Sequence, residues 1–231
     1  MPNNHFIVQD SISSFIQKGA KLYSNSLYVR DISRCFFSDE ITECGRKLCY
    51  RVNGKKYICQ YTNMEYNCNI ESKKRWINIL DHIDGVKVLE SDVVASDYNY
   101  NIITKIDCVI EITEKDLQYV VLVKSVEENK FNTVKNNEAT RKDIVEIMTN
   151  MWLIELSNGI IIYENRNSLD FIVYNVIPSN EIVNSVKEKT KKLIVYKNKG
   201  SVPPRPYADR ESYECKHCEF YGSCWDKCFI D

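Results

Sequence analysis

The spacing of apolar residues along the chain predicts a series of helices. In two long stretches, apolar residues three and four positions apart define one amphipathic face. These faces consist of Trp76, Ile79, Leu80 and Ile83 in a predicted helix 72–83, and of Ile144, Ile147, Met148 and Met151 in a predicted helix 139–156. Short helices are expected at 11–16 and 27–37. Ser179 is placed to cap another helix that ends near Val195, with the acidic Glu181 in its first turn.

Apolar runs between polar turns predict the strands. Asn53-Gly54 is a strong two-residue hairpin signal, so segments 50–52 and 56–59 are expected to pair as strands. Further strands are expected at 86–89, 102–112, 119–126, 159–163 and 170–174. The order of helix, strand meander, long helix and hairpin predicts an α/β sandwich with a mixed sheet.

Length and composition indicate one globular domain over residues 1–231, because 44% of the residues are apolar, 27% are charged and only 7 are glycine. We expect an N-terminal helical part (1–50), a core (51–178) and a C-terminal part (179–231) with a helix and a cysteine-rich segment. No apolar run approaches the length of a membrane span, and the first ten residues do not resemble a signal peptide. The expected location is therefore the cytoplasm or another intracellular compartment.

A formal net charge of −1 excludes a generally basic nucleic-acid binder but allows a local basic patch. In residues 187–205 the basic side chains are opposed by Glu188 alone. They are Lys187, Lys189, Lys191, Lys192, Lys197, Lys199 and Arg205. Lys187, Lys191 and Lys192 are candidate nucleic-acid contacts, although a solvated face of a surface helix explains the run equally well.

Ten cysteines in a chain that is neither small nor visibly exported favour metal binding over disulfides. Four of them crowd the C-terminus: Cys215, Cys218, Cys224 and Cys228. The tail cysteines alone would suit a zinc site, and three of them with a distant cysteine would suit an iron–sulfur cluster. Cys59, Cys68 and Cys108 lie in apolar or strand-like surroundings and are expected to be small buried hydrophobes.

A resemblance distinguishes between these two ligand sets. The segment Glu43-Cys44-Gly45-Arg46-Lys47-Leu48-Cys49-Tyr50 resembles the Cys-Pro-Arg-Lys-Phe-Tyr segment of iron–sulfur nucleases of the RecB type, such as the CRISPR-adaptation exonuclease and AddB-type subunits. The family's tail carries three more cysteines, with the spacing that Cys215, Cys218 and Cys224 share. The resemblance implies a restriction-endonuclease-like PD-(D/E)XK fold and a [4Fe–4S] cluster on these four cysteines that joins the chain ends. Cys35 and Cys228 are reserve ligands, and zinc is the alternative metal.

The resemblance also implies a nuclease centre, in which an Asp on one strand and Glu-x-Lys on the next hold Mg²⁺ or Mn²⁺. Asp107 matches the aspartate and Lys124 the lysine. Leu122 stands at the glutamate position, and Glu127 has the wrong parity to share a strand face with Lys124. The family's upstream histidine position falls among Ser72, Lys73 and Lys74.

Two later motifs complete the comparison. The hairpin Gly159-Ile160-Ile161-Ile162-Tyr163-Glu164-Asn165-Arg166 is close to the family's Gly-Ile-Ile-x-Tyr-Glu-Asn-Lys. The positions of the family's Gln-x-x-x-Tyr motif fall on Glu146 and Asn150. Asp143, Glu146 and Asn150 share one helical face, which makes Glu146 a candidate for the missing carboxylate. The simpler interpretation is a solvent-facing or unused polar face.

Three functions are consistent with these patterns. The leading hypothesis is a nuclease-fold iron–sulfur protein with a lost or remodelled nuclease centre, which binds DNA, single-stranded or at ends, or a partner protein. The second is an active metal-dependent DNA exonuclease that uses Asp107, Lys124 and Glu146. The third is a zinc-bearing interaction protein. The Asn-, Lys- and Ile-rich composition suits an AT-rich genome, such as that of a phage or another virus.

Overall fold

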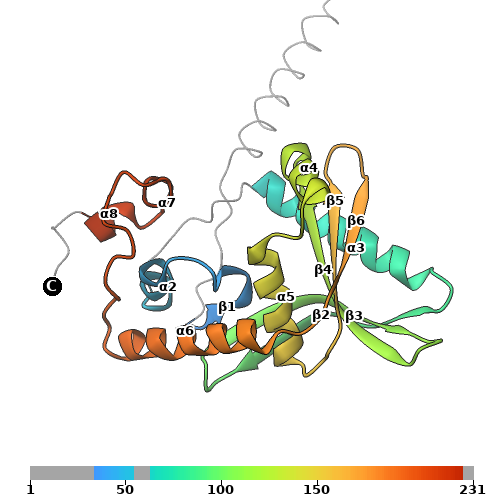
Figure 1. The fold of residues 1–231 in the computed structure, drawn as a ribbon, viewed down its shortest axis with the longest axis horizontal. Helices are drawn as coiled ribbons and strands as arrows, with labels where there is room; N and C mark the ends of the chain where they lie inside the picture. The colour runs from blue at the N-terminus through green and yellow to red at the C-terminus, as the bar shows by residue number, and fades with distance from the viewer. Residues whose placement is uncertain (1–33, 55–62, 226–231) are drawn as a thin grey trace, which may run out of the picture.

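A six-stranded mixed sheet organises residues 34–54 and 63–225, the parts of the chain that the computed structural model describes (Figure 1). Its strands are β1 (Phe36–Phe37), β2 (Val86–Asp97), β3 (Ile102–Ile112), β4 (Leu117–Val126), β5 (Gly159–Asn165) and β6 (Phe171–Val176). Neighbouring strands follow the order β1-β3-β4-β5-β6. Strand β2 lies off this path and pairs with β3. The β1–β3 and β4–β5 pairs are parallel and the others antiparallel. The predicted mixed α/β sheet is confirmed.

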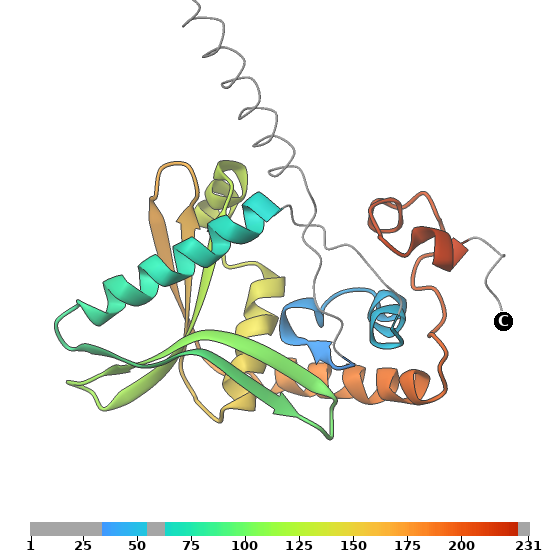
Figure 2. The ribbon, with the colours of Figure 1, turned by 180° about the vertical axis from the view of Figure 1, so that it is seen from behind.

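Helices cover both faces of this sheet (Figures 1 and 2). On one face, α3 (Asn63–Asp81) packs Trp76 and Leu80 against Val121 and Val123 of β4. On the other face, α4 (Glu128–Asn136) and α5 (Arg141–Leu153) share a core with Leu122 and other residues of the central strands. Successive side chains of β4 therefore point alternately toward α3 and toward α5, as the strand period of two requires.

The C-terminal part crosses beside the sheet and returns toward the first helix. The helix α6 (Asn180–Asn198) packs against α2 (Gly45–Val52), with Leu193 in contact with the cluster that contains Leu48 and Cys49. After α6 the chain turns back beside α2, and the last helices of the described residues are α7 (Tyr213–Lys216) and α8 (Tyr221–Trp225) (Figure 2). Segments more than 150 positions apart in sequence thus lie together.

Several sequence predictions match these elements. The strand predicted at 102–112 is β3, the long helix is α5, and the two apolar segments after it form the antiparallel hairpin β5–β6. Ser179 caps α6 as expected, because its side chain accepts a hydrogen bond from the Ile182 backbone N–H at 3.4 Å.

The hairpin predicted around Asn53-Gly54 is wrong. Residues 50–52 are the last turn of α2, and Gly54, with φ +84°, follows the end of that helix. Leu48, Cys49 and Val52 are buried in the core shared with α6, so tertiary packing selects a helix here over the local turn signal.

Other elements also differ from the sequence expectations. The helix predicted at 72–83 is α3, which begins earlier, at Asn63, and ends at Asp81. Phe36–Phe37 is a strand rather than the end of a helix, because Phe36 is fully buried and its backbone N–H bonds to the carbonyl of Asn101. The strand predicted at 86–89 continues to Asp97 as a polar outer strand. The helix α4 went unpredicted, although Phe131 and Val134 bury its inner face. The predicted helix 11–16, residues 27–33 and strand 56–59 lie outside the described residues.

Among the helices of residues 34–54 and 63–225, none combines the length and the apolar character that a membrane crossing requires.

Candidate metal centre and nuclease-like site

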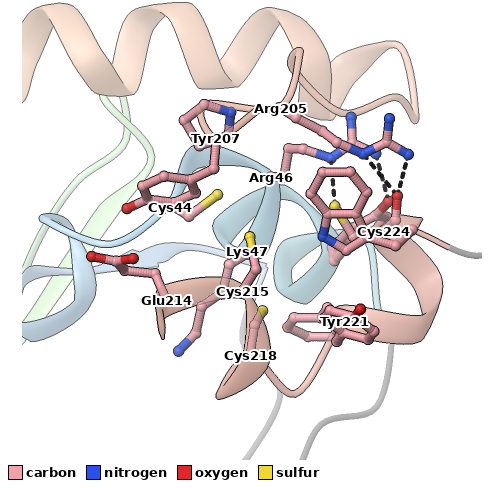
Figure 3. Close-up of a pocket in the computed structure, with 14 residues that line it drawn as sticks. Cys44, Arg46, Lys47, Arg205, Tyr207, Glu214, Cys215, Cys218, Tyr221 and Cys224 are labelled. Carbon is pink, nitrogen blue, oxygen red and sulfur yellow. Dashed lines mark hydrogen bonds between the residues drawn. The ribbon is translucent and has the colours of Figure 1, made fainter. Parts of the chain in front are cut away.

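The four cysteines predicted as cluster ligands line a single pocket (Figure 3). Cys44 immediately precedes α2, Cys215 lies in α7, Cys218 follows α7, and Cys224 lies in α8. All four side chains are free thiols of intermediate exposure. The fold therefore brings the start of the described chain and its end to the same place.

The two reserve ligands differ from this set. Cys35 does not line the pocket, and its backbone carbonyl accepts a hydrogen bond from Arg51. Cys228 lies outside the described residues, as does Cys59. Cys108 is fully buried, and burial raises the pKa of its thiol to about 12, so it behaves as the small core residue that was predicted.

Arg46 links α2 to the returning tail. Its Nε donates to Cys224 Sγ at 3.2 Å, Nη1 donates to the Pro203 carbonyl at 2.7 Å, and Nη2 donates to Tyr50 Oη at 2.9 Å. The tail is held further by the Lys47–Glu219 ion pair at 3.1 Å. Contacts within the chain thus hold α2 and the tail around the pocket.

Replacing Arg46 with alanine is expected to loosen the tail, because it removes three hydrogen bonds from a half-buried site. In metal-free protein we expect a loss of about 1–3 kcal/mol in the free energy of unfolding and faster limited proteolysis near α7 and α8. The exposed Arg210, which pairs with Glu211 at 3.4 Å, provides the control variant Arg210→Ala. Equal proteolysis of wild type and both variants would show that Arg46 does not hold the tail.

The donor set of this pocket suits a metal cluster. Four thiols from two chain ends are the ligand number and type that a [4Fe–4S] cluster takes. Within residues 34–54 and 63–225, no three histidine, cysteine or acidic side chains converge closely enough to hold a single metal ion. Burial raises the pKa of Cys218 to about 11, and metal binding would release its proton.

A second polar cluster lies between β4 and α5. Lys124 Nζ contacts Glu146 Oε2 at 2.6 Å and Asp143 Oδ1 at 3.6 Å. Asp143 also accepts hydrogen bonds from Tyr163 Oη at 2.7 Å and from the Thr140 hydroxyl at 2.6 Å. The predicted proximity of Lys124 and Glu146 is therefore present in the structure.

The charges in this cluster depend on one another. Burial alone would lower the pKa of Lys124, but Glu146 and Asp143 outweigh burial and raise it, so the ammonium stays charged. Burial would raise the pKa of Asp143, yet Lys124 holds it below its ordinary value. Burial raises the pKa of Glu146, and Lys124 does not fully compensate. Lys124 is thus the cation that makes two buried carboxylates tolerable.

Asp107 does not join this cluster. Its Oδ1 pairs with Lys73 Nζ of α3 at 2.5 Å, and its Oδ2 accepts from the Val123 backbone N–H at 2.7 Å. Lys73 is one of the three residues at the family's histidine position. The structure therefore places Asp107 toward α3 and Lys124 toward α5, and the three residues proposed as catalytic do not converge.

The remaining motif positions also have structural contacts. Leu122 is 1% exposed in the core on the α5 side, and Glu127 is the residue that precedes α4. Asn150 accepts a hydrogen bond from Thr104 at 2.6 Å inside the protein, so it is not a solvent-facing residue.

Glu164 is a polar residue whose importance sequence reasoning missed. It is 2% exposed and accepts hydrogen bonds from Ser72 at 3.0 Å and Trp76 Nε1 at 2.8 Å, together with an ion pair to Arg75 at 2.5 Å. Its place in the family-like hairpin was the available signal. In this chain it connects β5 to α3.

The candidate nucleic-acid lysines all lie on α6. Lys187 and Lys191, four positions apart, place their ammonium groups over the Tyr100 ring, each at 5.6 Å from its centroid. Lys192 is exposed at the next position around the helix. Lys189, from the same run, turns toward α2 and donates to the Glu43 carbonyl at 2.6 Å.

Comparisons with known proteins support the fold. No protein-family model matches the sequence, and no curated protein matches it significantly. Among solved structures, an alkaline exonuclease from Laribacter hongkongensis, LHK-Exo, matches with a TM-score of 0.56 and 8% identity over 72% of this chain and 89% of that one. Its complex with dAMP matches at 0.56 and 10% identity, over the same shares of the two chains. The protein SSO0001 matches at 0.52 and 14% identity, over 97% of this chain and 96% of that one. The chain therefore shares the fold of an exonuclease.

Proposed function

We propose that this chain is a nuclease-fold iron–sulfur protein that binds single-stranded DNA without cutting it. The fold is that of an exonuclease, one structure of which holds dAMP, and this likeness supports DNA as the ligand. A protein partner that recruits the chain to DNA is compatible with this role.

The observation that carries the absence of cleavage is the separation of the acidic side chains. Metal-dependent nucleases need several carboxylates around one divalent ion, since the ion stabilises the charge that develops in the transition state. Here Asp107 pairs with Lys73, Glu146 pairs with Lys124, and the strand position between them is Leu122. In each pair a lysine ammonium already supplies the positive charge that the carboxylate needs.

The cysteine pocket supports the cluster part of the proposal. Cys44, Cys215, Cys218 and Cys224 would hold a [4Fe–4S] cluster through four iron–sulfur bonds, one on the N-terminal side and three on the tail, and so would join the two chain ends. Arg46 and Lys47 lie beside these thiols and offset the negative charge that four thiolates bring. The cluster's role would then be structural.

A cleavage assay distinguishes this proposal from an active exonuclease. End-labelled single-stranded DNA is incubated with cluster-loaded protein and Mg²⁺ or Mn²⁺, and its binding is measured in parallel. We expect binding with no shortening of the strand. Shortening that Glu146→Ala abolishes would contradict the proposal and establish the exonuclease.

The exonuclease is the second candidate because Glu146 and Lys124 meet on the α5 side at 2.6 Å, as a remodelled site would require. In that case Asp107 must leave Lys73 to reach the metal. If the chain is an exonuclease, Lys73→Ala should raise the rate of cleavage severalfold. If it is the non-cleaving protein proposed above, Lys73→Ala should show no cleavage. An exposed lysine in the β3–β4 turn provides the control variant Lys115→Ala.

A further inference from the structure

Aromatic and cationic side chains gather where the β2–β3 turn meets α6. The Tyr100 and Trp152 rings meet edge to face, with centroids 5.2 Å apart. Lys187 Nζ lies 4.6 Å from the Trp152 ring centroid, and Lys197 Nζ donates to Asn101 Oδ1 at 2.8 Å. Tyr98, in the same turn, is 88% exposed.

This turn meets α6 on a different side from α2 (Figure 1). Lys189 faces α2 through its contact with the Glu43 carbonyl, while Lys187 and Lys191 face Tyr100. The surface is therefore distinct from the cysteine pocket. We call the set of Tyr98, Tyr100, Trp152, Lys187, Lys191 and Lys197 the α6 surface.

The α6 surface carries three lysines although the whole chain has a net charge of −1. Asp97, beside Tyr98, accepts hydrogen bonds from the backbone N–H groups of Asn99 and Tyr100 within the turn. The acidic residue within the lysine run is Glu188, which lies 3.4 Å from Lys191 in an exposed pair. Such exposed pairs contribute little energy and yield easily to another anion. The ammonium groups of Lys187, Lys191 and Lys197 are thus available to bind successive phosphates of a nucleic-acid strand.

The exposed aromatic side chain indicates the class of nucleic acid. Bases of a duplex are stacked on one another, but an unpaired base can stack on a protein ring, and every base has a face for this contact. Cations beside such a ring bind the backbone that links successive bases. Tyr98 is open for stacking, while Tyr100 and Trp152 hold the lysines in place through cation–π contacts.

We infer that the α6 surface binds single-stranded nucleic acid, with a base stacked on Tyr98 and phosphates on Lys187 and Lys191. The inference rests on the proposed function and adds the site to it. An acidic protein segment would use the same lysines but would not need the planar face of Tyr98.

The test is fluorescence anisotropy of a labelled oligothymidine of about 20 nucleotides, measured with full-length protein over a range of salt concentrations. Tyr98→Ala is expected to weaken binding about 5- to 100-fold, while Tyr98→Phe keeps the stacking ring and the affinity. Lys187→Gln combined with Lys191→Gln should lower the slope of log affinity against log salt by about 1.4, because two phosphate contacts are lost. Lys115→Gln, in the β3–β4 turn, is the control.

The outcomes separate the site from the function. If wild type binds and every variant binds equally well, the α6 surface is not the site, but DNA binding stands. If Tyr98→Phe weakens binding as much as Tyr98→Ala, stacking is wrong. If duplex DNA binds as tightly as the single strand, the assigned ligand class is wrong. If wild type binds no nucleic acid, the proposed function fails together with the inference.

Discussion

Lys124→Met is expected to destabilise the protein by about 3–5 kcal/mol, one of the largest effects of any single change in this chain. The side chains of Asp143 and Glu146 are 4% and 7% exposed, and the variant leaves both carboxylates buried without their cation. Urea unfolding followed by circular dichroism measures the loss. Adding Glu146→Gln should recover part of it, because a neutral amide needs no cation.

The pH dependence of this loss has a definite sign. Because the pKa of Asp143 is lowered in the folded protein, its stabilising contribution is present above pH of about 4 and is lost as the pH falls further. The difference in the free energy of unfolding between wild type and Lys124→Met should therefore become smaller below a pH of about 4. The control is Lys105→Met, since the Lys105–Asp92 pair at 2.9 Å is exposed and its loss costs less than about 1 kcal/mol. Equal losses for the two lysines would contradict the buried-cation role.

Cys44→Ala is expected to remove nearly all bound metal, because it takes away the one ligand that the N-terminal side gives to the pocket. Iron content after anaerobic purification is the measurement. The same loss is expected for Cys215→Ala, which acts from the other end of the chain. Cys35→Ala is the matched control, since Cys35 has similar exposure and does not line the pocket.

The pattern of metal loss identifies the ligand set. If Cys35→Ala loses the metal and Cys44→Ala keeps it, the reserve ligand is the true one. If neither variant changes the metal content, the tail cysteines bind metal by themselves and the two chain ends are not joined through it.

The gathering of these four cysteines in one pocket could be predicted from sequence in part because three of them follow short local spacings. Cys215 and Cys218 are near each other in any fold, and the resemblance around Cys44 supplied the distant partner. Long-range contacts, such as Arg46 with Pro203 and Tyr50 with Phe220, bring Cys44 close to the tail. No short sequence pattern marks these contacts. Spacing and resemblance thus selected the four cysteines that line the pocket, but not the packing that gathers them.

The position of Asp107 could not be predicted because strand parity fails within β3. Ile106 and Val109 both belong to the core on the α5 side, whereas Cys108 belongs to the core on the α3 side. Strict alternation would have placed Ile106 and Cys108 together. On the neighbouring strand, Asp92 lies between the residues paired with Ile106 and Cys108 and has φ +56°. The register of the two strands also shifts between Val88 and Glu90.

The helix face with Asp143, Glu146 and Asn150 was predicted correctly as a face, but its role was left open between catalysis and a solvent-facing or unused polar face. The structure excludes solvent exposure, because the three residues are 3%, 5% and 0% exposed. Each has a partner inside the protein, Lys124 for the two acids and Thr104 for the amide oxygen of Asn150, whose Nδ2 is buried without a hydrogen-bond partner among the described residues. Burial of polar groups requires such partners, and sequence periodicity alone cannot identify them.

A [4Fe–4S] cluster on Cys44, Cys215, Cys218 and Cys224 would join the two ends of this nuclease-like fold. The most direct test of this proposal is the iron, zinc and acid-labile sulfide content of wild-type protein purified without oxygen. We predict iron and sulfide in equal amounts, close to four of each per chain, with little zinc. About one zinc per chain with no sulfide would contradict the cluster and make the pocket a zinc site.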